Sequence, residues 1–179
     1  MNHIDLGTVL RQTLSASLYS NLVTRPTGRA VRSAIETMLD TKGRSLTVID
    51  FSDVRMIDFS CADEVIAKLL LQYNESSEAY FVFRGMKEDH LDAIESVLER
   101  HGLALVLERE SGVELFGVVG ELESRVYQGV KRRGRAEAWE LAVDLAETEP
   151  KVQSALDGLW RRRLIMRSGD AFTPLGDAA

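Results

Sequence analysis

Apolar and polar positions follow two different periods along the first 110 residues. Residues 46–51, 80–84 and 103–107 form short, almost continuously apolar runs that are rich in strand-favouring side chains. Apolar residues recur at helical spacing in the segments 31–39, 62–73 and 91–98. Strands that alternate with helices over short links predict a mainly parallel sheet with helices packed on it. Residues 4–10 are a candidate for one additional strand.

The pattern changes near residues 108–112, where a charged stretch ends in Ser-Gly. Beyond it, apolar stripes at helical spacing predict helices over 115–130, 138–145 and 152–159. Residues 164–167 and 171–175, separated by Ser-Gly-Asp, are typical of a hairpin. Three helices with a tight turn between the last two and a closing hairpin predict a winged helix-turn-helix. We therefore expect an α/β domain over 1–110 and a small winged-helix domain over 111–179.

Composition narrows the function classes. The 179 residues are 45% hydrophobic and carry a formal net charge of −6, which argues against a protein whose whole surface coats nucleic acid. A single cysteine, Cys61, excludes an intramolecular disulfide and favours a reducing compartment. No apolar stretch approaches the roughly 20 residues of a membrane span, and the N-terminal residues are unlike a signal peptide. We expect a cytoplasmic protein with no membrane association.

Residues 46–73, LTVIDFSDVRMIDFSCADEVIAKLLLQY, resemble the STAS domain family of sulfate transporters and anti-sigma-factor antagonists, in particular its divergent bacterial branch. The residues that match the family pattern are Asp50, Val54, Ile57, Asp58 and Ser60. The resemblance implies a STAS-like sheet with packed helices over residues 1–110. In the antagonists a partner kinase phosphorylates a serine, and Ser60 falls on that position, while Phe59 and Cys61 depart from the family motif. The implied partner is a kinase or an anti-sigma-type factor.

Asp50, Asp58, Ser60 and Cys61 are thus the candidate switch loop. Ser60 has two interpretations, a helix N-cap that forms a capping box with Asp63, or a phosphate acceptor at a helix N-terminus. The carboxylates could serve acid–base or metal chemistry, but without a companion histidine or nucleophile they fit turn and cap roles better. Cys61 is either a redox-sensitive thiol or a small packed side chain. We expect no enzyme, no metal and no cofactor.

The second domain resembles the winged helix-turn-helix of small bacterial transcription regulators. Its candidates for contact with double-stranded DNA are Lys131, Arg132, Arg133, Arg135, Lys151, Gln153, Ser154, Arg161, Arg162 and Arg167. Two observations oppose DNA binding. The basic runs lie at helix C-termini, which favour cations anyway, and Glu147 and Glu149 precede the expected recognition helix. From Ser111 onward, 10 Lys and Arg face 11 Asp and Glu, a balance of −1.

Together these patterns predict a bacterial signalling or transcription regulator. In it, a STAS-like switch domain that binds a protein partner is coupled to a winged-helix domain that binds DNA, with residues 115–130 as the candidate homodimer contact. The alternative is a protein–protein adaptor in which both domains bind proteins and neither binds DNA.

Overall fold

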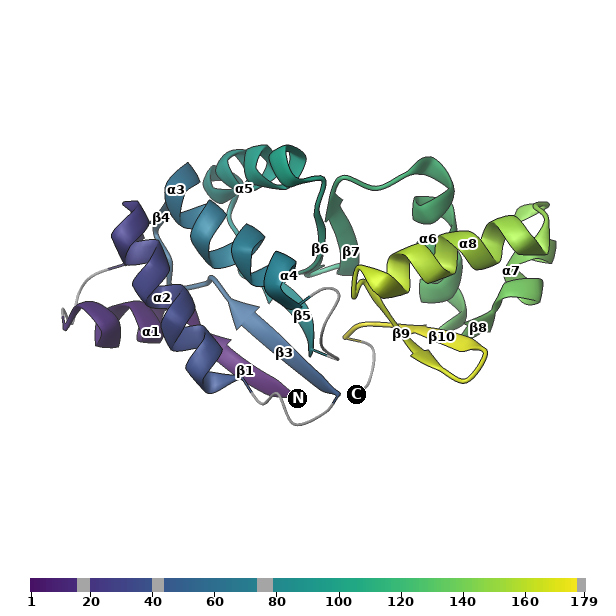
Figure 1. Ribbon diagram of the computed structural model, residues 1–179, viewed down its shortest axis with the longest axis horizontal. Coiled ribbons are helices and arrows are strands. Elements are labelled where there is room, and N and C mark those ends of the chain that lie inside the picture. Colours follow the sequence, from purple (N-terminus) through teal and green to yellow (C-terminus); the bar gives the residue numbers. More distant parts are fainter. Residues whose placement is uncertain (16–19, 40–43, 74–78, 177–179) are drawn as a thin grey trace. The chain divides into compact units, whose positions relative to one another are not determined.

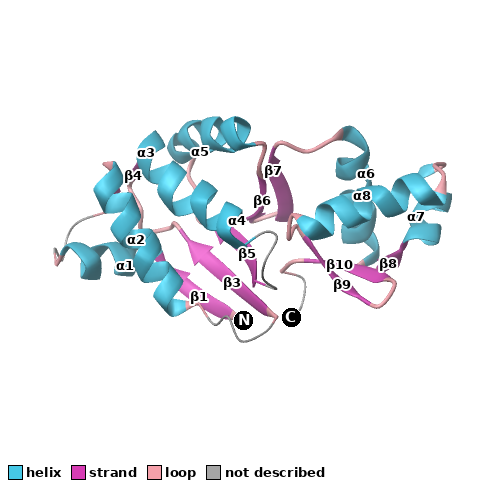
Figure 2. Cartoon of the chain, in the orientation of Figure 1, coloured by secondary structure: helices cyan, strands magenta, loops and turns pink. Residues whose placement is uncertain are grey.

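The computed structural model describes residues 1–15, 20–39, 44–73 and 79–176. The chain divides into two compact units, Met1–Val118 and Val119–Ala179. Figure 2 shows that the first unit combines a sheet with helices, while the second is mainly helical. Each unit has its own buried apolar residues, so each is described by itself below.

A five-stranded sheet in the order β1-β3-β5-β6-β7 forms the centre of the first unit. Its strands are β1 (Asn2–Asp5), β3 (Ser45–Asp50), β5 (Ala79–Arg84), β6 (Ala104–Arg109) and β7 (Gly112–Gly117). The first four are parallel, and β7 pairs antiparallel with β6. The predicted α/β class is confirmed, with a mixed sheet. In the parallel register Asp5, Asp50, Arg84 and Glu108 are successive partners, so charged side chains gather at the carboxyl ends of the strands.

Helices cover one face of this sheet (Figure 1). They are α1 (Leu6–Leu14), α2 (Arg25–Met38), α3 (Phe59–Ala62), α4 (Lys68–Tyr73) and α5 (Glu88–His101). A π-helical turn, η1 (Asp63–Ala67), joins α3 to α4, and a two-stranded parallel pair of β2 (Asn21–Leu22) and β4 (Met56–Ile57) lies ahead of α3. Ile49, Phe83, Val65 and Ile94 are fully buried between the sheet and the helices.

The second unit consists of three helices and a small antiparallel sheet. The helices are α6 (Glu121–Arg133), α7 (Ala138–Leu145) and α8 (Glu149–Arg161). The strands are β8 (Ala136–Glu137), β9 (Ile165–Ser168) and β10 (Ala171–Pro174), in the sheet order β8-β10-β9. Val126, Leu141 and Leu156, one from each helix, are fully buried, which is the expected result of their helical spacing.

Four sequence-based boundaries differ from the structure. The helix predicted over 115–130 begins at Glu121, and the unit boundary falls after Val118 rather than after residue 110, because residues 112–117 form β7. Gly112 and Gly117, with φ values of 105° and 109°, bracket this strand, and a Cβ at position 117 would lie 2.6 Å from Leu103 O. Leu115 therefore belongs to an edge strand whose apolar residues happened to extend the helical stripe.

The N-terminal strand is also shorter than the predicted 4–10. β1 stops at Asp5, because the Asp5 carboxylate accepts hydrogen bonds from Gly7 N (2.9 Å) and Thr8 N (3.3 Å) and so caps α1. The helix predicted over 62–73 begins earlier, at Phe59, and contains the π turn. No helix among the described ranges has both the length and the apolar character needed to cross a bilayer.

Candidate functional site

Asp58 organises the loop that leads into α3. Its Oδ1 accepts hydrogen bonds from Cys61 N (2.8 Å) and Ser60 Oγ (2.8 Å), and its Oδ2 accepts one from Thr24 N (2.9 Å). Asp58 is therefore the N-cap, and the prediction that Ser60 is the cap is wrong. Burial opposes ionisation of Asp58, but the hydrogen bonds from Thr24 and Cys61 outweigh it and lower the pKa of this carboxyl.

Ser60 lies in the first turn of α3, half-buried, with its hydroxyl engaged by Asp58. A phosphoryl group on Ser60 would replace this donor by an anion beside the Asp58 carboxylate. The adjacent Phe59 is exposed, and the Arg100 guanidinium carbon lies 5.8 Å from the centre of its ring. A modified Ser60 would thus lose its hydrogen bond to the carboxylate that caps α3 through Cys61 N.

Cys61 is a packed side chain rather than a reactive thiol. It is fully buried, and its Sγ donates to Thr24 O at 3.0 Å. Burial, together with the Asp58 carboxylate, raises the pKa of Cys61 to about 12. The thiolate that redox chemistry requires is therefore scarce at neutral pH.

Asp50 belongs to a separate cluster at the carboxyl ends of β1, β3 and β5. Its Oδ1 accepts from Ser52 N (2.9 Å) and Ser52 Oγ (2.6 Å), and its Oδ2 accepts from Arg84 Nε (2.8 Å). Arg84 also donates from Nη2 to His3 Nε2 at 2.7 Å. Burial alone would raise the pKa of Asp50, but the bonds from Ser52 and Arg84 lower it to about 2. Asp50 is thus an ionised structural anchor, and it shares no hydrogen bond with Asp58.

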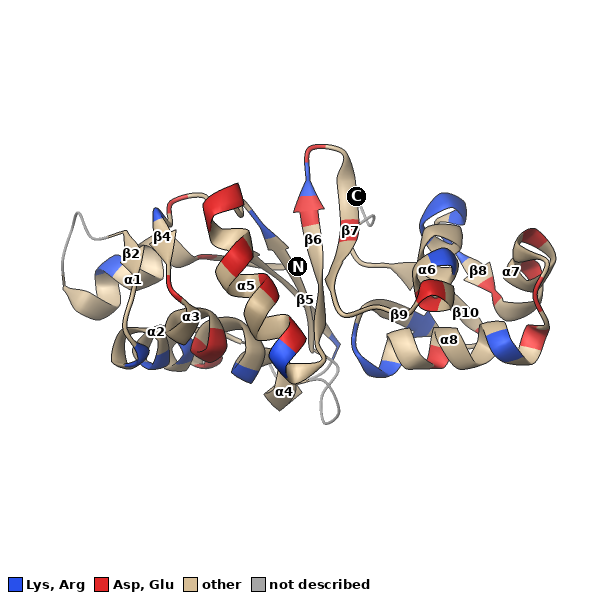
Figure 3. Ribbon diagram, turned by 90° about the horizontal axis from the view of Figure 1, so that it is seen from above, with Lys and Arg blue, Asp and Glu red and all other residues tan. Residues whose placement is uncertain are grey.

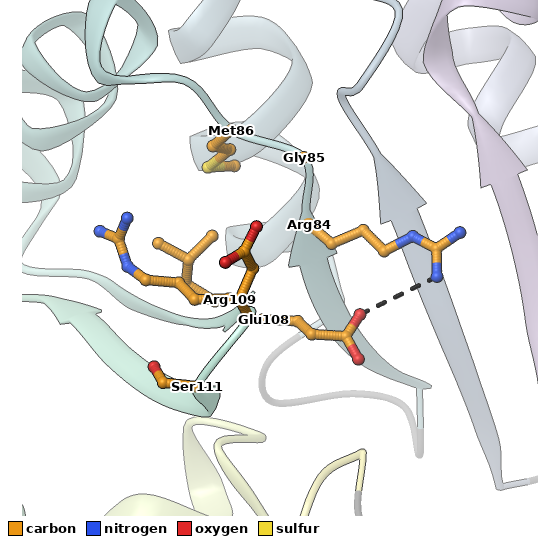
Figure 4. A pocket seen from close by; sticks show the side chains of 8 residues that line it. Arg84, Gly85, Met86, Glu108, Arg109 and Ser111 are labelled. Carbon is orange, nitrogen blue, oxygen red and sulfur yellow. Dashed lines mark ion pairs between the residues drawn. The ribbon is translucent and has the colours of Figure 1, made fainter.

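A hollow of about 720 Å³ opens beside this cluster, at the carboxyl ends of β5 and β6. It is lined by Arg84, Gly85, Met86, Leu107, Glu108, Arg109, Glu110 and Ser111. In Figure 4, Arg84 and Glu108 lie on one side, with an Nη1–Oε2 distance of 4.0 Å, and Arg109 extends on the other. Ligands of open α/β sheets commonly bind outside the carboxyl ends of the strands. Both of its arginines are paired, since Arg109 bonds to Glu114 and Arg84 to Asp50.

A second charge cluster, the η1 cluster, was missed by the sequence reasoning, which treated Asp63 as a cap partner. It comprises Arg25, Arg32, Asp63, Glu64, Lys68 and His101. Arg25 Nη1 donates to both Asp63 Oδ2 (2.7 Å) and Glu64 Oε1 (2.8 Å). His101 Nε2 lies 2.8 Å from Asp63 Oδ1, Arg32 Nη2 lies 3.3 Å from Glu64 Oε2, and Lys68 also bonds to Glu64.

The backbone explains how the η1 cluster forms. Gly28 lets α2 approach closely, since a Cβ there would lie 3.0 Å from Cys61 Cα and 3.1 Å from Glu64 Cβ. Both Asp63 and Glu64 are buried, in a π-helical turn of a kind often found at functional positions. Burial disfavours their ionisation, but the bonds from Arg25 to Asp63 and from Lys68 to Glu64 lower the pKa of each carboxyl. The signal in the sequence was two adjacent carboxylates inside an apolar helical stripe.

The structure pairs several of the DNA-binding candidates with carboxylates. Arg133 Nε bonds to Asp144 Oδ2 at 2.7 Å, and Arg162 Nη1 bonds to Glu123 Oε2 at 3.1 Å. Arg167 lies 3.6 Å from Asp157 and over the Trp160 ring, while Lys151 lies 3.7 Å from Glu147. Among the DNA-binding candidates, those whose side chains have no hydrogen bond or ion pair to a described residue are the exposed Arg132, Arg135 and Arg161 and the half-buried Lys131.

The polar candidates on α8 have acidic surroundings. Gln153 Nε2 donates to Asp157 Oδ1 at 3.0 Å, so its amide is already engaged. Ser154 is exposed and, with Lys151, borders a hollow of about 480 Å³ that also contains Glu121 and Glu123 of the first turn of α6. The Ser154 hydroxyl has no hydrogen bond to another described side chain.

No group of three or more histidine, cysteine, aspartate or glutamate side chains in the described parts of the chain is arranged to hold a metal ion. Comparison of the sequence with protein families finds no matching family, and comparison with curated proteins finds no match either.

Proposed function

We propose that this protein is a bacterial signalling or transcription regulator in which a STAS-like unit receives a signal and a winged helix-turn-helix binds double-stranded DNA. The observation that carries the proposal is the arrangement of the second unit. Its elements run α6-β8-α7-α8-β9-β10, with the short β8 paired to β10 and the β9-β10 hairpin at the end of the chain. This order is typical of a winged helix, in which the last helix enters the major groove and the hairpin is the wing.

The charges that support DNA binding are the unpaired ones. Lys131, Arg132 and Arg135 cluster where α6 ends, and Arg161 closes α8, with no described carboxylate bonded to any of them. Phosphate contacts of this kind supply most of the non-specific affinity for a duplex. The paired Arg133 and Arg162 would have to exchange a carboxylate for a phosphate, so they contribute less.

Fluorescence anisotropy of a labelled duplex, titrated with salt, tests this proposal. We expect affinity to fall linearly with salt on logarithmic axes. Arg132→Ala and Arg161→Ala should each flatten that slope by about 1. Arg55→Ala is the matched control, because Arg55 is an exposed arginine of the first unit. Absence of duplex binding at low salt, or an equal effect of Arg55→Ala, would show that the second unit is not a DNA-binding domain.

A second candidate function is that of a protein–protein adaptor, with no DNA binding. Trp139 and Val143 lie one turn apart on α7 and are 55% and 76% exposed. Exposed aromatic and aliphatic side chains at helical spacing are characteristic of protein interfaces. The acidic residues around Lys151 and Gln153 are also easier to reconcile with a protein partner than with phosphate. Two results together would favour the adaptor. The chain would bind a protein partner with an affinity that does not depend on salt and that Trp139→Ala abolishes, and it would bind no duplex.

For the first unit, the Asp58–Ser60 contact supports a switch that a kinase or an anti-sigma-type factor recognises. The variant Ser60→Asp places a carboxylate next to Asp58 and should alter partner binding. Calorimetric titration with an identified partner measures this change. Ser96→Asp is the matched control, since Ser96 lies on the exposed side of α5. Identical partner affinity for Ser60→Asp and the unmodified chain would count against the switch.

A further inference from the structure

The outer side of α2 carries a row of arginines. Arg25, Arg29 and Arg32 follow one another at spacings of four and three residues, so they lie along one side of the helix. Figure 3 shows blue segments repeated along α2, in contrast to the red ones along α5. The first turn of α2 contains no acidic residue. Arg32 pairs with Glu36 of the same helix at 3.4 Å, and the other carboxylates that balance this row, Asp63 and Glu64, come from η1.

The two η1 carboxylates are buried beneath the arginines. Glu64 is completely buried and Asp63 is 6% exposed, whereas the Arg25 side chain is 42% exposed. The negative charge of the η1 cluster thus lies inside the protein and the positive charge lies at the surface. Because two carboxylates hold Arg25 through Nη1 alone, its guanidinium has a fixed position. No described residue bonds to its Nε or Nη2. The N–H groups on these two nitrogens therefore remain available to a ligand.

A hollow of about 430 Å³ lies against this side of α2. Its lining residues are Arg25, Pro26, Arg29, Ala30 and Ser33. Arg29 and Ser33 are exposed, and neither side chain bonds to a described residue. The lining therefore combines two guanidinium groups, one of them fixed in position, with a hydroxyl donor and two small apolar side chains. No carboxylate of the described residues is among its lining residues.

We propose that this hollow binds a phosphate group, either as inorganic phosphate or as a small phosphate monoester. Arginine forks bind phosphate oxygens with two parallel hydrogen bonds, and a serine hydroxyl supplies a further donor. Holding Arg25 in place beforehand reduces the conformational entropy lost on binding. The inference concerns α2 of the first unit and does not depend on DNA binding by the second.

Calorimetric titration of the full chain with inorganic phosphate, at constant ionic strength maintained with sodium chloride, tests the proposal. We expect saturable binding that Arg29→Gln weakens by about tenfold, equivalent to about 1.4 kcal/mol. Arg29→Lys should restore part of the loss, since it returns the charge without the fork. Arg55→Gln, a change of an exposed arginine elsewhere in the same unit, should leave the affinity unchanged.

A second arm of the titration uses glycerol 3-phosphate to distinguish the two sources of the group. Tighter binding of the monoester than of inorganic phosphate would assign the hollow to a small organic phosphate, and the reverse order would assign it to the free anion. The proposal is overturned if neither probe binds saturably, or if Arg29→Gln and Arg55→Gln weaken binding equally. None of these variants alters Asp63 or Glu64, so the fold of the unit should be retained.

Discussion

Gly85 follows β5 with a φ of +69°, in a place where no side chain fits. A Cβ there would lie 2.3 Å from Ser52 Oγ, 2.5 Å from Ser52 N and 2.8 Å from Asp50 Oδ1. The close approach allows Ser52 and Arg84 to bond to Asp50 at the same time. A larger residue would separate the ends of β3 and β5 and disrupt the bonds that keep Asp50 ionised.

We therefore expect Gly85→Ala to lower the free energy of unfolding of the first unit by roughly 3 kcal/mol, from backbone strain and overlap together. Gly102→Ala is the matched control. Gly102 has a similar φ of +64° but nothing within 4 Å of its Cβ position, so only the backbone cost of about 1 to 2 kcal/mol applies. Hydrogen exchange of the β3 and β5 amides measures both variants. Equal destabilisation by the two would show that the contact with Ser52 is unimportant.

His90 joins the start of α5 to the loop after β3. Its imidazole is fully buried; Nδ1 accepts from Lys87 N at 3.2 Å, and Nε2 lies 3.3 Å from Arg55 O. Burial lowers the pKa of His90; the hydrogen bond to Arg55 O opposes this, while the nearby Lys87 charge acts in the same direction as burial and Asp89 against it. The neutral ring is therefore the form that the folded chain requires.

A folded pKa below the unfolded value of about 6.5 means that the unfolded chain binds the proton first. The contribution of His90 to the free energy of unfolding is complete above about pH 6.5. It decreases as the pH falls, by at most about 1.4 kcal/mol per pH unit. His90→Asn retains an acceptor but does not titrate, so its stability between pH 7 and pH 5.5 should depend less on pH. A urea-unfolding series at several pH values checks this, and parallel curves for both proteins would contradict it.

At the scale of elements, Glu64 joins η1 to α2. This buried carboxylate is in contact with Arg25, Arg32 and Lys68. Glu64→Gln keeps the shape but leaves these cations around a neutral group, and removing one partner of a buried ion pair is costly. We expect a loss of roughly 2 to 4 kcal/mol, measured by urea unfolding. Glu95→Gln, an exposed carboxylate on α5, should change stability by less than about 0.5 kcal/mol.

At the scale of elements, the apolar pattern of the sequence predicts some helices and strands better than others. Periodicity located β3, β5, β6 and α5 well, because buried strands and an amphipathic helix leave direct apolar patterns. Periodicity missed β7, because Leu115 of this strand extends the apolar stripe of the following helix. It also missed the end of β1, which is set by the Asp5 side chain that caps α1. The sequence pattern could not predict the η1 cluster, because a π turn departs from the 3.6-residue period and Arg25 is 38 residues from its partner Asp63.

For the whole molecule, the strand order places β7 at the edge of the sheet, so the first unit ends at Val118. A fragment of residues 1–110 would leave β6 without its antiparallel partner and expose an apolar edge strand that can pair with other chains. We expect that fragment to aggregate in light scattering, whereas a fragment of residues 1–118 should remain monomeric at the same concentration. Equal solubility of the two would mean that β7 is dispensable to the first unit.

The position of β7 also sets an order of events during synthesis. The ribosome releases a chain from its N-terminus at roughly 5 to 20 residues per second, so β1, β3, β5 and β6 emerge before the strand that closes their sheet. Until Gly117 leaves the exit tunnel, the nascent chain presents β6 as an open edge. The emergence of β7 thus sets the time at which the first unit can complete its sheet, while the second unit is still being translated.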